Sequence, residues 1–335
     1  MAGAQERVLR RRIRTVESTK KITRAMELIA ASRIVRAQQA IAAARPYVTK
    51  IAEVVEHVSD TPEARDHPLF RRAESAQNAA IILVTADRGL AGGYNSSIVR
   101  TVERMVRDHR SRGLEPQLVT VGRKGESYFR YRRQPIMASI TGVSDRPSYE
   151  DARRIVAAVM EPFVAGELDQ IELVFTRFVS LGSQVVTTKQ LVPLVRDEPS
   201  GDRSRTDPEA TSAAATAATA TSGSGDLPTV YEFEPEPDEI LDRLLPSWLE
   251  AEVLAALLEA AASEHAARQR AMKAATDNAD ELIKNLRRVM NRARQDSITT
   301  EIMEIVGGAE ALRHAGGDPG ASAYHENFQP AAESA

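Results

Sequence analysis

The two ends of the chain carry the spacing of apolar residues that is typical of long paired helices. Between residues 30 and 58, apolar side chains alternate at intervals of four and three, which is the heptad spacing of a left-handed coiled coil. They are Ala30, Ile34, Ala37, Ile41, Ala44, Val48, Ile51, Val55 and Val58. Between Ile13 and Ile29 the spacing of the apolar residues is less regular, so we expect the register to drift there. Pro46 removes one backbone donor, which predicts a bend in the helix and not its end.

The partner helix is expected at the other end of the chain. From Pro246 to Leu312 the sequence has no further proline and no glycine before Gly307, so nothing breaks a helix for about sixty residues. In its second half, apolar residues recur at spacings near three and four and form a narrow stripe that needs a partner. The stripe comprises Leu282, Ile283, Leu286, Val289, Met290, Ala293, Ile298, Ile302, Ile305 and Leu312. We therefore predict that the two ends of the chain pair as an antiparallel coiled coil.

The middle of the chain alternates short apolar runs with helical patterns, which is typical of an open α/β sheet. The runs that resemble strands are residues 79–84, 117–121, 136–140, 171–175 and 184–194, and the helical segments are residues 96–112, 124–132 and 148–165. Ser148 fits an N-cap, with Glu150 and Asp151 favourably placed in the first turn that follows. The predicted fold class is a long antiparallel coiled coil of the N- and C-terminal helices plus an open, Rossmann-like α/β domain.

These patterns divide the chain into five segments. We expect an N-terminal coiled-coil helix over residues 1–58, an α/β domain over residues 75–195 and a C-terminal coiled-coil helix over residues 238–312. Residues 197–229 are rich in Ala, Thr, Ser and Gly and too poor in apolar side chains to fold alone, so we predict a disordered insertion there. The tail, residues 313–335, is expected to be flexible.

Charge is distributed unevenly, although the formal net charge is only -3. Residues 1–50 hold twelve Lys and Arg against three Glu, whereas residues 197–239 hold eleven acidic residues against two Arg. A basic helix implies an acidic partner, which could be nucleic acid, an anionic membrane face or acidic protein elements. Nucleic acid is the weaker interpretation, because no base-stacking aromatic residues and no nucleic-acid-binding motif accompany the basic residues.

The glycines after the first predicted strand lie where a phosphate-binding turn would be found. The turn runs from Asp87 to Asn95 and carries Gly89, Gly92 and Gly93. Their spacing fits neither the dinucleotide-binding motif nor the P-loop, whose Lys-Ser/Thr pair is missing. We interpret the turn as structural, with glycines at positive φ and with Asp87 and Asn95 bonding to the turn. Residues 122–125, which also carry two glycines, are a still weaker candidate.

The sequence offers no catalytic set of residues. The six histidines are scattered, no two of them have metal-ligand spacing, and no Ser/His/Asp set can be proposed. Cysteine is absent, which excludes disulfides and thiolate metal sites. We therefore predict neither a cofactor nor a metal. No apolar run reaches the ~18 residues of a membrane span, so direct membrane insertion is not expected.

Four segments closely resemble the gamma subunit of F-type ATP synthase, and the resemblance identifies the chain as a bacterial member of that family. They are residues 20–33, 87–95, 263–278 and 293–309. The resemblance implies a non-catalytic rotor, the central stalk of F1, which proton flow turns through the c-ring so that the catalytic subunits make ATP. It implies α, β, epsilon and c-ring subunits as partners, no nucleic acid, and a peripheral position on the cytoplasmic face of the cell membrane.

The resemblance also implies which residues touch the β subunits. The residues expected near an acidic lever of β are Lys20, Lys21, Arg24 and Met26, and those expected at the β loop that grips the helix are Arg294, Gln295, Thr299 and Glu301. Two other functions stay open from the residues alone. One is an enzyme with an α/β nucleotide-binding domain, and the other is a coiled-coil scaffold that binds an acidic partner or nucleic acid.

Overall fold

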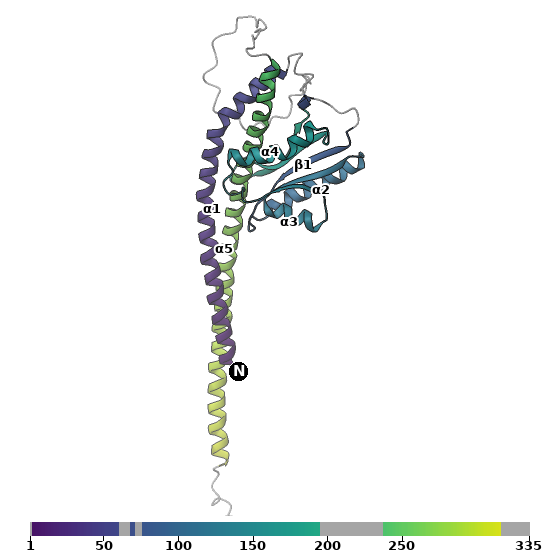
Figure 1. The fold of residues 1–335 in the computed structure, drawn as a ribbon. Helices are drawn as coiled ribbons and strands as arrows, with labels where there is room; N and C mark the ends of the chain where they lie inside the picture. Colours follow the sequence, from purple (N-terminus) through teal and green to yellow (C-terminus); the bar gives the residue numbers. More distant parts are fainter. Residues whose placement is uncertain (1, 60–67, 71–75, 195–236, 316–335) are drawn as a thin grey trace, which may run out of the picture. The chain divides into compact units, whose positions relative to one another are not determined.

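The computed structural model describes residues 2–59, 68–70, 76–194 and 237–315. Two long helices, α1 (Ala2–Ser59) and α5 (Pro237–Ala315), flank the sheet in sequence (Figure 1). The chain forms two compact units. The smaller consists of residues 1–25 and 273–335, and the larger of residues 26–272. The predicted insertion, residues 197–229, and residues 316–335 of the predicted tail lie outside the described residues.

The larger unit is built on a mixed five-stranded sheet in the order β3-β2-β1-β4-β5. Its strands are β1 (Asn78–Val84), β2 (Glu115–Val121), β3 (Ile136–Ile140), β4 (Gln170–Phe178) and β5 (Gln184–Val192). The strands from β3 to β4 pair in parallel, and β5 runs antiparallel to β4. Six of the seven residues of β1 are buried, as expected for a central parallel strand covered on both faces.

Helices cover both faces of this sheet. They are α2 (Tyr94–Ser111), α3 (Arg123–Tyr131) and α4 (Tyr149–Val164), with a short 3₁₀ helix, η2 (Pro68–Phe70), before β1. Ile81 and Leu83 of β1 pack with α2 and α3, whereas Ala80 and Ile82 pack with α4 and with parts of α1 and α5. Because alternate residues of a strand point to opposite faces, α2 and α3 cover one face, and α4, α1 and α5 cover the other.

The helix signals in the sequence are largely confirmed. The Ser148 side chain accepts a hydrogen bond from the Asp151 backbone, and Asp151 accepts one from the Ser148 backbone, which is a capping box. α1 continues through Pro46, so the helix does not end there. α5 begins at Pro237, one residue before the predicted start at residue 238, and continues through Pro246. Within the described residues, no helix has both the length and the apolar character that crossing a membrane requires.

The predicted heptad of α1 is confirmed over residues 30–58. Its apolar positions are all buried or half-buried, and five of them, Ala30, Ile34, Ile51, Val55 and Val58, are at most 7% exposed. In the larger unit these residues face α5 and the sheet. Val55 and Val58 share one core cluster with Leu241 and Leu245 of α5. Burial of one continuous stripe is the main apolar contribution that holds α1 in place.

In the smaller unit, α1 and α5 pair antiparallel, because contacts that move forward along α1 move backward along α5. The contacting sets are Ile13 with Ile283 and Leu286, Lys20 with Asp280, and Thr23 with Thr276. The two threonine hydroxyls lie 2.8 Å apart. The antiparallel coiled coil predicted from the sequence is therefore present.

The predicted drift of the α1 register is wrong. Ile22 and Ile29 are 59% and 54% exposed, whereas Glu27 is buried and Lys20 and Thr23 are half-buried. Residues 16, 20, 23, 27 and 30 therefore continue the spacing of four and three, with polar side chains at three inward positions. The prediction failed because it followed apolar residues only.

The apolar stripe of α5 is covered only in part by this chain. Ile283 and Leu286 are buried, but Ile298, Ile302 and the stripe residues beyond them are 46–76% exposed. Ile13 already lies opposite Ile283 and Leu286, so the few residues of α1 before it cannot reach the end of α5. The expectation that α1 covers the whole stripe, Ile302 included, is wrong for the described residues.

Gly122 allows the tightest backbone contact in the sheet domain. Its φ is +90°, and a Cβ at this position would lie 2.1 Å from the carbonyl oxygen of Thr85. Gly125 is similar, because its Cβ would lie 2.8 Å from the Thr85 hydroxyl oxygen. These are the glycines that the sequence analysis rated weakest, and they bring the start of α3 against the end of β1.

Gly122→Ala should destabilise the chain far more than Gly113→Ala. Both glycines have positive φ, but a Cβ at Gly113 would meet nothing within 4 Å. The control should therefore lose only the backbone term of about 1–2 kcal/mol. Gly122→Ala adds a clash with backbone and should cost several kcal/mol more, or prevent folding. Urea denaturation checks this, and equal losses in the two variants would contradict the steric account.

Candidate functional site

Polar and charged side chains gather where the loops after β1 and β3 meet α1 and α5. This is the carboxyl end of the parallel strands, the edge at which open α/β sheets usually bind their ligands. The participants are Asp87 after β1, Ser144 and Asp145 after β3, Arg33 on α1, and Glu264, His265 and Arg268 on α5. We call them the edge cluster.

Asp87 ties three loops together. Its carboxylate accepts backbone N–H groups from Arg123 (3.1 Å), Gly142 (2.9 Å) and Ser144 (3.1 Å), and its own N–H donates to the Ser144 hydroxyl. Burial opposes ionisation of Asp87, but the hydrogen bonds outweigh burial and hold its pKa below the ordinary value. Asp87 thus reaches beyond its own turn, to which the sequence analysis had confined it.

The glycine turn after β1 differs in detail from the expectation. Gly92 has a positive φ of +57°, whereas Gly89 and Gly93 do not, and Leu90 adopts +65° in their place. The Asn95 side-chain oxygen accepts the Ala86 N–H at 2.9 Å and so closes the turn. The bond from Asn95 is as expected, but the expected positive φ is found at Gly92 alone among the three glycines, and Leu90 takes a left-handed conformation that is strained for a leucine.

A buried ion pair joins α5 to this turn. The Arg268 guanidinium lies 2.6 Å from the Glu264 carboxylate, and the two side chains are 8% and 1% exposed. The same guanidinium donates to the carbonyl oxygen of Gly89 at 3.2 Å. Burial raises the pKa of Glu264 and Arg268 limits the rise, which leaves this pKa at about 7. Arg268 therefore links α5 to the loop after β1.

The other charged residues of the edge cluster are Arg33 and Asp145, which neutralise each other. Arg33 pairs with Asp145 at 2.7 Å. His265 is buried, and burial and Arg268 lower its pKa to about 4, so its ring is neutral at neutral pH. Ligand atoms of Asp145, Glu264 and His265 lie within 4.8 Å of one another, close enough to hold a metal ion. Two guanidinium groups already neutralise the two carboxylates, so we interpret the cluster as an ion-pair network.

The residues expected to contact β subunits do not form one site. Lys20 pairs with Asp280 inside the coiled coil, and Lys21 and Arg24 are exposed. Met26, in the larger unit, is half-buried and lines a cavity of about 260 Å³. The other four are exposed on α5, where they make local contacts such as the bond from the Thr299 hydroxyl to the Gln295 carbonyl. They are Arg294, Gln295, Thr299 and Glu301.

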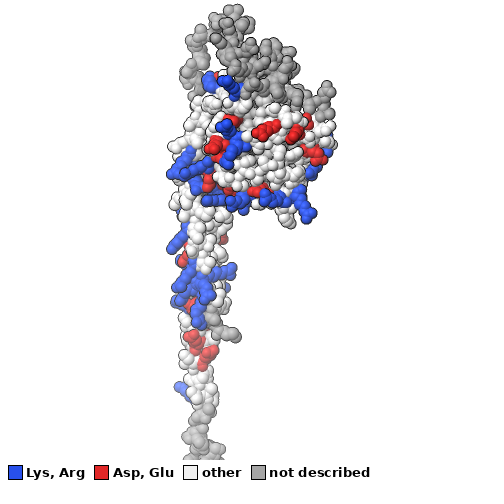
Figure 2. Space-filling view, in the orientation of Figure 1, with Lys and Arg blue, Asp and Glu red and all other residues white. Residues whose placement is uncertain are grey.

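Basic side chains gather along the paired helices of the smaller unit (Figure 2). This agrees with the excess of Lys and Arg in the first fifty residues. The edge cluster was missed by the sequence analysis, although one signal was available. Glu264 and Arg268 are four residues apart, the spacing that brings side chains together on a helix.

Comparisons with known proteins agree with this architecture. A family model described as ATP synthase matches residues 5–312. A protein of Frankia casuarinae named ATP synthase gamma chain is 48% identical over 316 residues, which are 93% of this chain and 99% of the relative. A protein of the same name from Salinispora tropica is 44% identical over 330 residues, 94% of this chain and 99% of the relative.

Solved structures show the same fold at low identity. A chain of the Euglena gracilis mitochondrial ATP synthase, from a structure of OSCP, F1 and the c-ring, matches with a TM-score of 0.63 and 17% identity, covering 98% of this chain and 100% of that one. A chain from the central stalk and c-ring of the Tetrahymena thermophila mitochondrial ATP synthase gives 0.53 and 24%, with 76% and 99% covered. The predicted fold class is confirmed.

Glu264→Gln should remove one pH-dependent contribution to stability, the one that makes stability fall as pH rises. The pKa of Glu264 is raised from 4.5 to about 7 in the folded chain, so the folded state holds the proton more tightly than the unfolded state does. The free energy of unfolding should therefore fall as pH rises from about 4.5 to about 7, by up to about 3 kcal/mol. The glutamine variant lacks this loss.

Urea denaturation at a series of pH values measures the effect. His265 titrates in the same range with the opposite sign, because its lowered pKa makes stability rise with pH; the comparison is therefore between variants and not within one profile. Glu301→Gln, at an exposed position of the same helix, is the control and should keep the wild-type profile. A Glu264→Gln profile parallel to wild type would contradict the prediction.

Proposed function

We infer that this chain, which belongs to the ATP synthase gamma chain family, is the central-stalk rotor subunit of a proton-driven F-type ATP synthase. Proton flow turns the c-ring and this chain with it. The turning helices push each catalytic β subunit in succession through states that bind ADP and phosphate, form ATP and release it. The observation that carries this conclusion is identity of 44–48% to gamma chains over more than nine-tenths of the chain.

The chain acts in this proposal as a non-catalytic subunit of an enzyme complex. What supports this is the edge of the sheet where an α/β enzyme would bind its ligand. There Arg268, paired with Glu264, bonds to the Gly89 carbonyl of the loop after β1. The nucleotide sites then belong to partner subunits. The alternatives, an α/β nucleotide enzyme or a nucleic-acid scaffold, are not favoured by the comparisons.

The proposed partners are the α, β, epsilon and c-ring subunits, with no nucleic acid among them. The related solved structures come from complexes whose titles name F1, the c-ring and the central stalk. The chain is peripheral to the membrane sector, and we place it on the cytoplasmic face of the cell membrane. Its basic smaller unit suits acidic surfaces on the surrounding subunits.

The end of α5 is proposed to enter the ring of catalytic subunits. Its apolar residues from Ile298 onwards are exposed in this chain, and a partner surface would bury them. Beside them, polar contacts to β are assigned to Arg294, Gln295, Thr299 and Glu301. On α1, Lys20, Lys21, Arg24 and Met26 are assigned to the acidic lever of β.

Polar contacts between α1 and α5 fix the register of the two helices, which a rotating subunit requires. Lys20 pairs with Asp280, and the hydroxyls of Thr23 and Thr276 lie 2.8 Å apart. Polar partners at inward heptad positions specify register at a cost in stability. Two helices that cannot slide past each other turn as one body. In the larger unit, the Arg268 contacts hold α5 to the sheet domain for the same purpose.

Purification from membranes tests the proposed function. An affinity-tagged copy of the full chain, extracted in mild detergent, should elute with α, β and c subunits and with ATP hydrolysis activity. Membrane vesicles depleted of this chain should lose proton-driven ATP synthesis and regain it when the chain is restored. Elution of the chain alone, with nucleic acid, or with its own ATPase activity would contradict the proposal.

Ile302→Asp should leave the stability of the isolated chain nearly unchanged and impair the function of the assembled complex. Ile302 is 53% exposed, so its replacement should change the stability of the isolated chain by no more than about 0.5 kcal/mol. In the complex, the added charge would be buried against a partner, and proton-driven synthesis should fall at least several-fold.

Thr300→Asp is the matched control, since Thr300 is exposed on a different side of the same helix turn. It should reduce synthesis much less. Thermal unfolding of the isolated variants and ATP synthesis in vesicles provide the two measurements. Equal synthesis by both variants would remove Ile302 from the contact surface.

A further inference from the structure

The ends of α2 and α3 carry an excess of positive charge. Residues 100–133, which include most of both helices, hold ten Lys and Arg against four Asp and Glu. Six of the ten lie in the last turns of the two helices or directly after them, and all six are exposed. They are Arg107, Arg110, Arg112, Arg130, Arg132 and Arg133. We call these six side chains the basic face.

The basic face is one surface, and most of its arginines are not neutralised. Glu103 of α2 lies 3.6 Å from Arg132, which follows α3, so this contact joins the two helix ends. Glu126 is paired with Arg130. The other four arginines form no ion pair with any described residue. They are therefore available to an anionic partner.

Both helices end at the edge of the sheet where the parallel strands begin. α2 leads to the start of β2, and α3 leads to the start of β3. β1, β2 and β4 start level with one another in the sheet. The basic face therefore lies at the amino ends of the parallel strands, whereas the edge cluster lies at their carboxyl ends.

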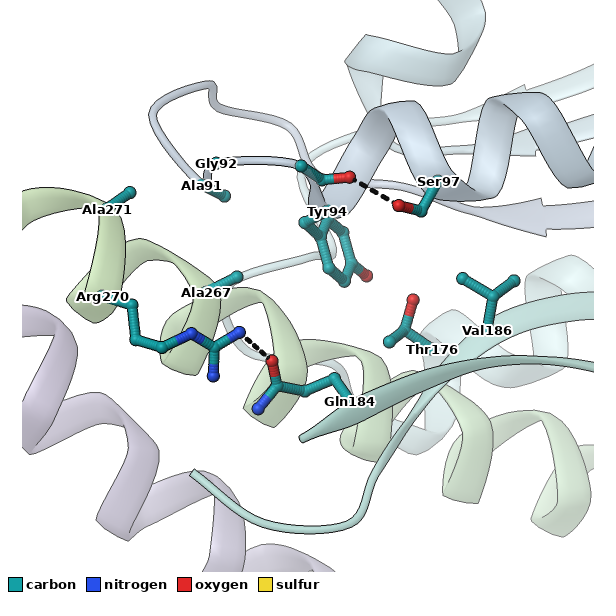
Figure 3. Close-up of a pocket in the computed structure, with 11 residues that line it drawn as sticks. Ala91, Gly92, Tyr94, Ser97, Thr176, Gln184, Val186, Ala267, Arg270 and Ala271 are labelled. Carbon is teal, nitrogen blue, oxygen red and sulfur yellow. Dashed lines mark hydrogen bonds between the residues drawn. The ribbon is translucent and has the colours of Figure 1, made fainter. Parts of the chain in front are cut away.

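β5 carries the chain to this same edge. It begins at Gln184, whose side chain bonds to α5 (Figure 3). It then runs antiparallel to β4, and its last residue, Val192, pairs with Ile171 near the start of β4. His109, in the last turn of α2, lies 2.8 Å from Glu172, the next residue of β4. The chain thus leaves the sheet one strand away from the end of α2, and neighbouring strands are about 5 Å apart.

The part of the chain that follows β5 is acidic. Residues 195–236 join β5 to α5 and lie outside the described residues. They hold nine Asp and Glu against three Arg, and we call them the acidic segment. A third of the segment, fully extended, would span about 45 Å, so its length is sufficient to reach the whole basic face. Two groups tethered on one chain also meet at an effective concentration on the order of 1 mM, well above that of a dilute free polyanion.

We propose that the acidic segment, residues 195–236, docks on the basic face at the ends of α2 and α3. The opposite charges, the exit of the chain at this edge and the length of the segment all support this occupant. Ion pairs between exposed side chains are individually weak and are screened by salt, so docking is strongest at low ionic strength. While docked, the segment competes with other anionic surfaces for the same arginines. The inference does not depend on the rotor function.

Energy transfer between two dyes tests the proposal in the full chain. Because the chain has no cysteine, Tyr131→Cys at the end of α3 and Ala215→Cys in the acidic segment provide two unique labelling sites. Transfer efficiency should be high at about 20 mM salt and should fall clearly at about 500 mM, where the charges are screened.

Arg107→Glu combined with Arg133→Glu reverses two unpaired charges of the basic face. This double variant should show, already at low salt, the transfer efficiency that the wild-type face shows at high salt. Arg146→Glu combined with Arg153→Glu is the matched control, because it makes the same change in net charge at exposed positions at the start of α4. The control should keep the wild-type dependence on salt, and thermal unfolding checks that both variants are folded alike.

A competing occupant is tested with heparin and with phosphatidylglycerol vesicles. A variant whose nine acidic residues in the segment are replaced by Asn and Gln should bind both probes several-fold more tightly than the wild-type chain at low salt. Equal binding by the two chains would mean that the face serves another anionic partner, and would overturn the proposal. Transfer efficiency that does not respond to salt, or that falls equally in both double variants, would also overturn it.

Discussion

The buried pair of Glu264 and Arg268 is the contact on which the arrangement of the larger unit depends. Both side chains are almost inaccessible to solvent, and Arg268 also bonds to the Gly89 carbonyl in the turn after β1. A buried charge is tolerated only when its partner is present, and Glu264 supplies that partner from α5 itself. The bond from Arg268 to the Gly89 carbonyl is therefore the contact that positions α5 against the sheet domain. Arg33 and Asp145 extend the same constraint to α1.

The contact between α5 and the loops lies at the edge of the sheet where a ligand would be expected. Open α/β sheets usually bind ligands at the carboxyl ends of their strands, and here side chains of α1 and α5 bond to the loops at that edge. The sheet domain therefore serves to hold the two long helices. What α5 leaves uncovered is the apolar stripe from Ile298 onwards, which suits contact with other subunits. The chain belongs to the gamma chain family, and this agrees with a sheet domain that holds the long helices and an α5 whose exposed end contacts other subunits.

Local patterns in the sequence predicted most of the fold. The heptad from Ala30 to Val58, the strands and the Ser148 cap depend on neighbours within a few residues, and they are confirmed. Polar residues at inward heptad positions escaped notice, because nothing local distinguishes Thr23 from an exposed threonine. Its partner, Thr276, is distant in sequence.

The edge cluster could not be predicted for the same reason. The bonds that Asp87 accepts from the segments after β2 and β3, and the bond from Arg268 to Gly89, join parts of the chain that only the tertiary fold brings together. The residues assigned to the β subunits stay predictions, because partner surfaces define them.

Rotation of this chain inside the assembled complex tests the central claim most directly. The chain has no cysteine, so a cysteine placed at Tyr131, which is 85% exposed at the end of α3, is unique in it and can carry a visible probe. With the catalytic ring fixed to a surface, added ATP should make the probe turn continuously in one direction. A probe that stays still while the complex hydrolyses ATP would contradict the account.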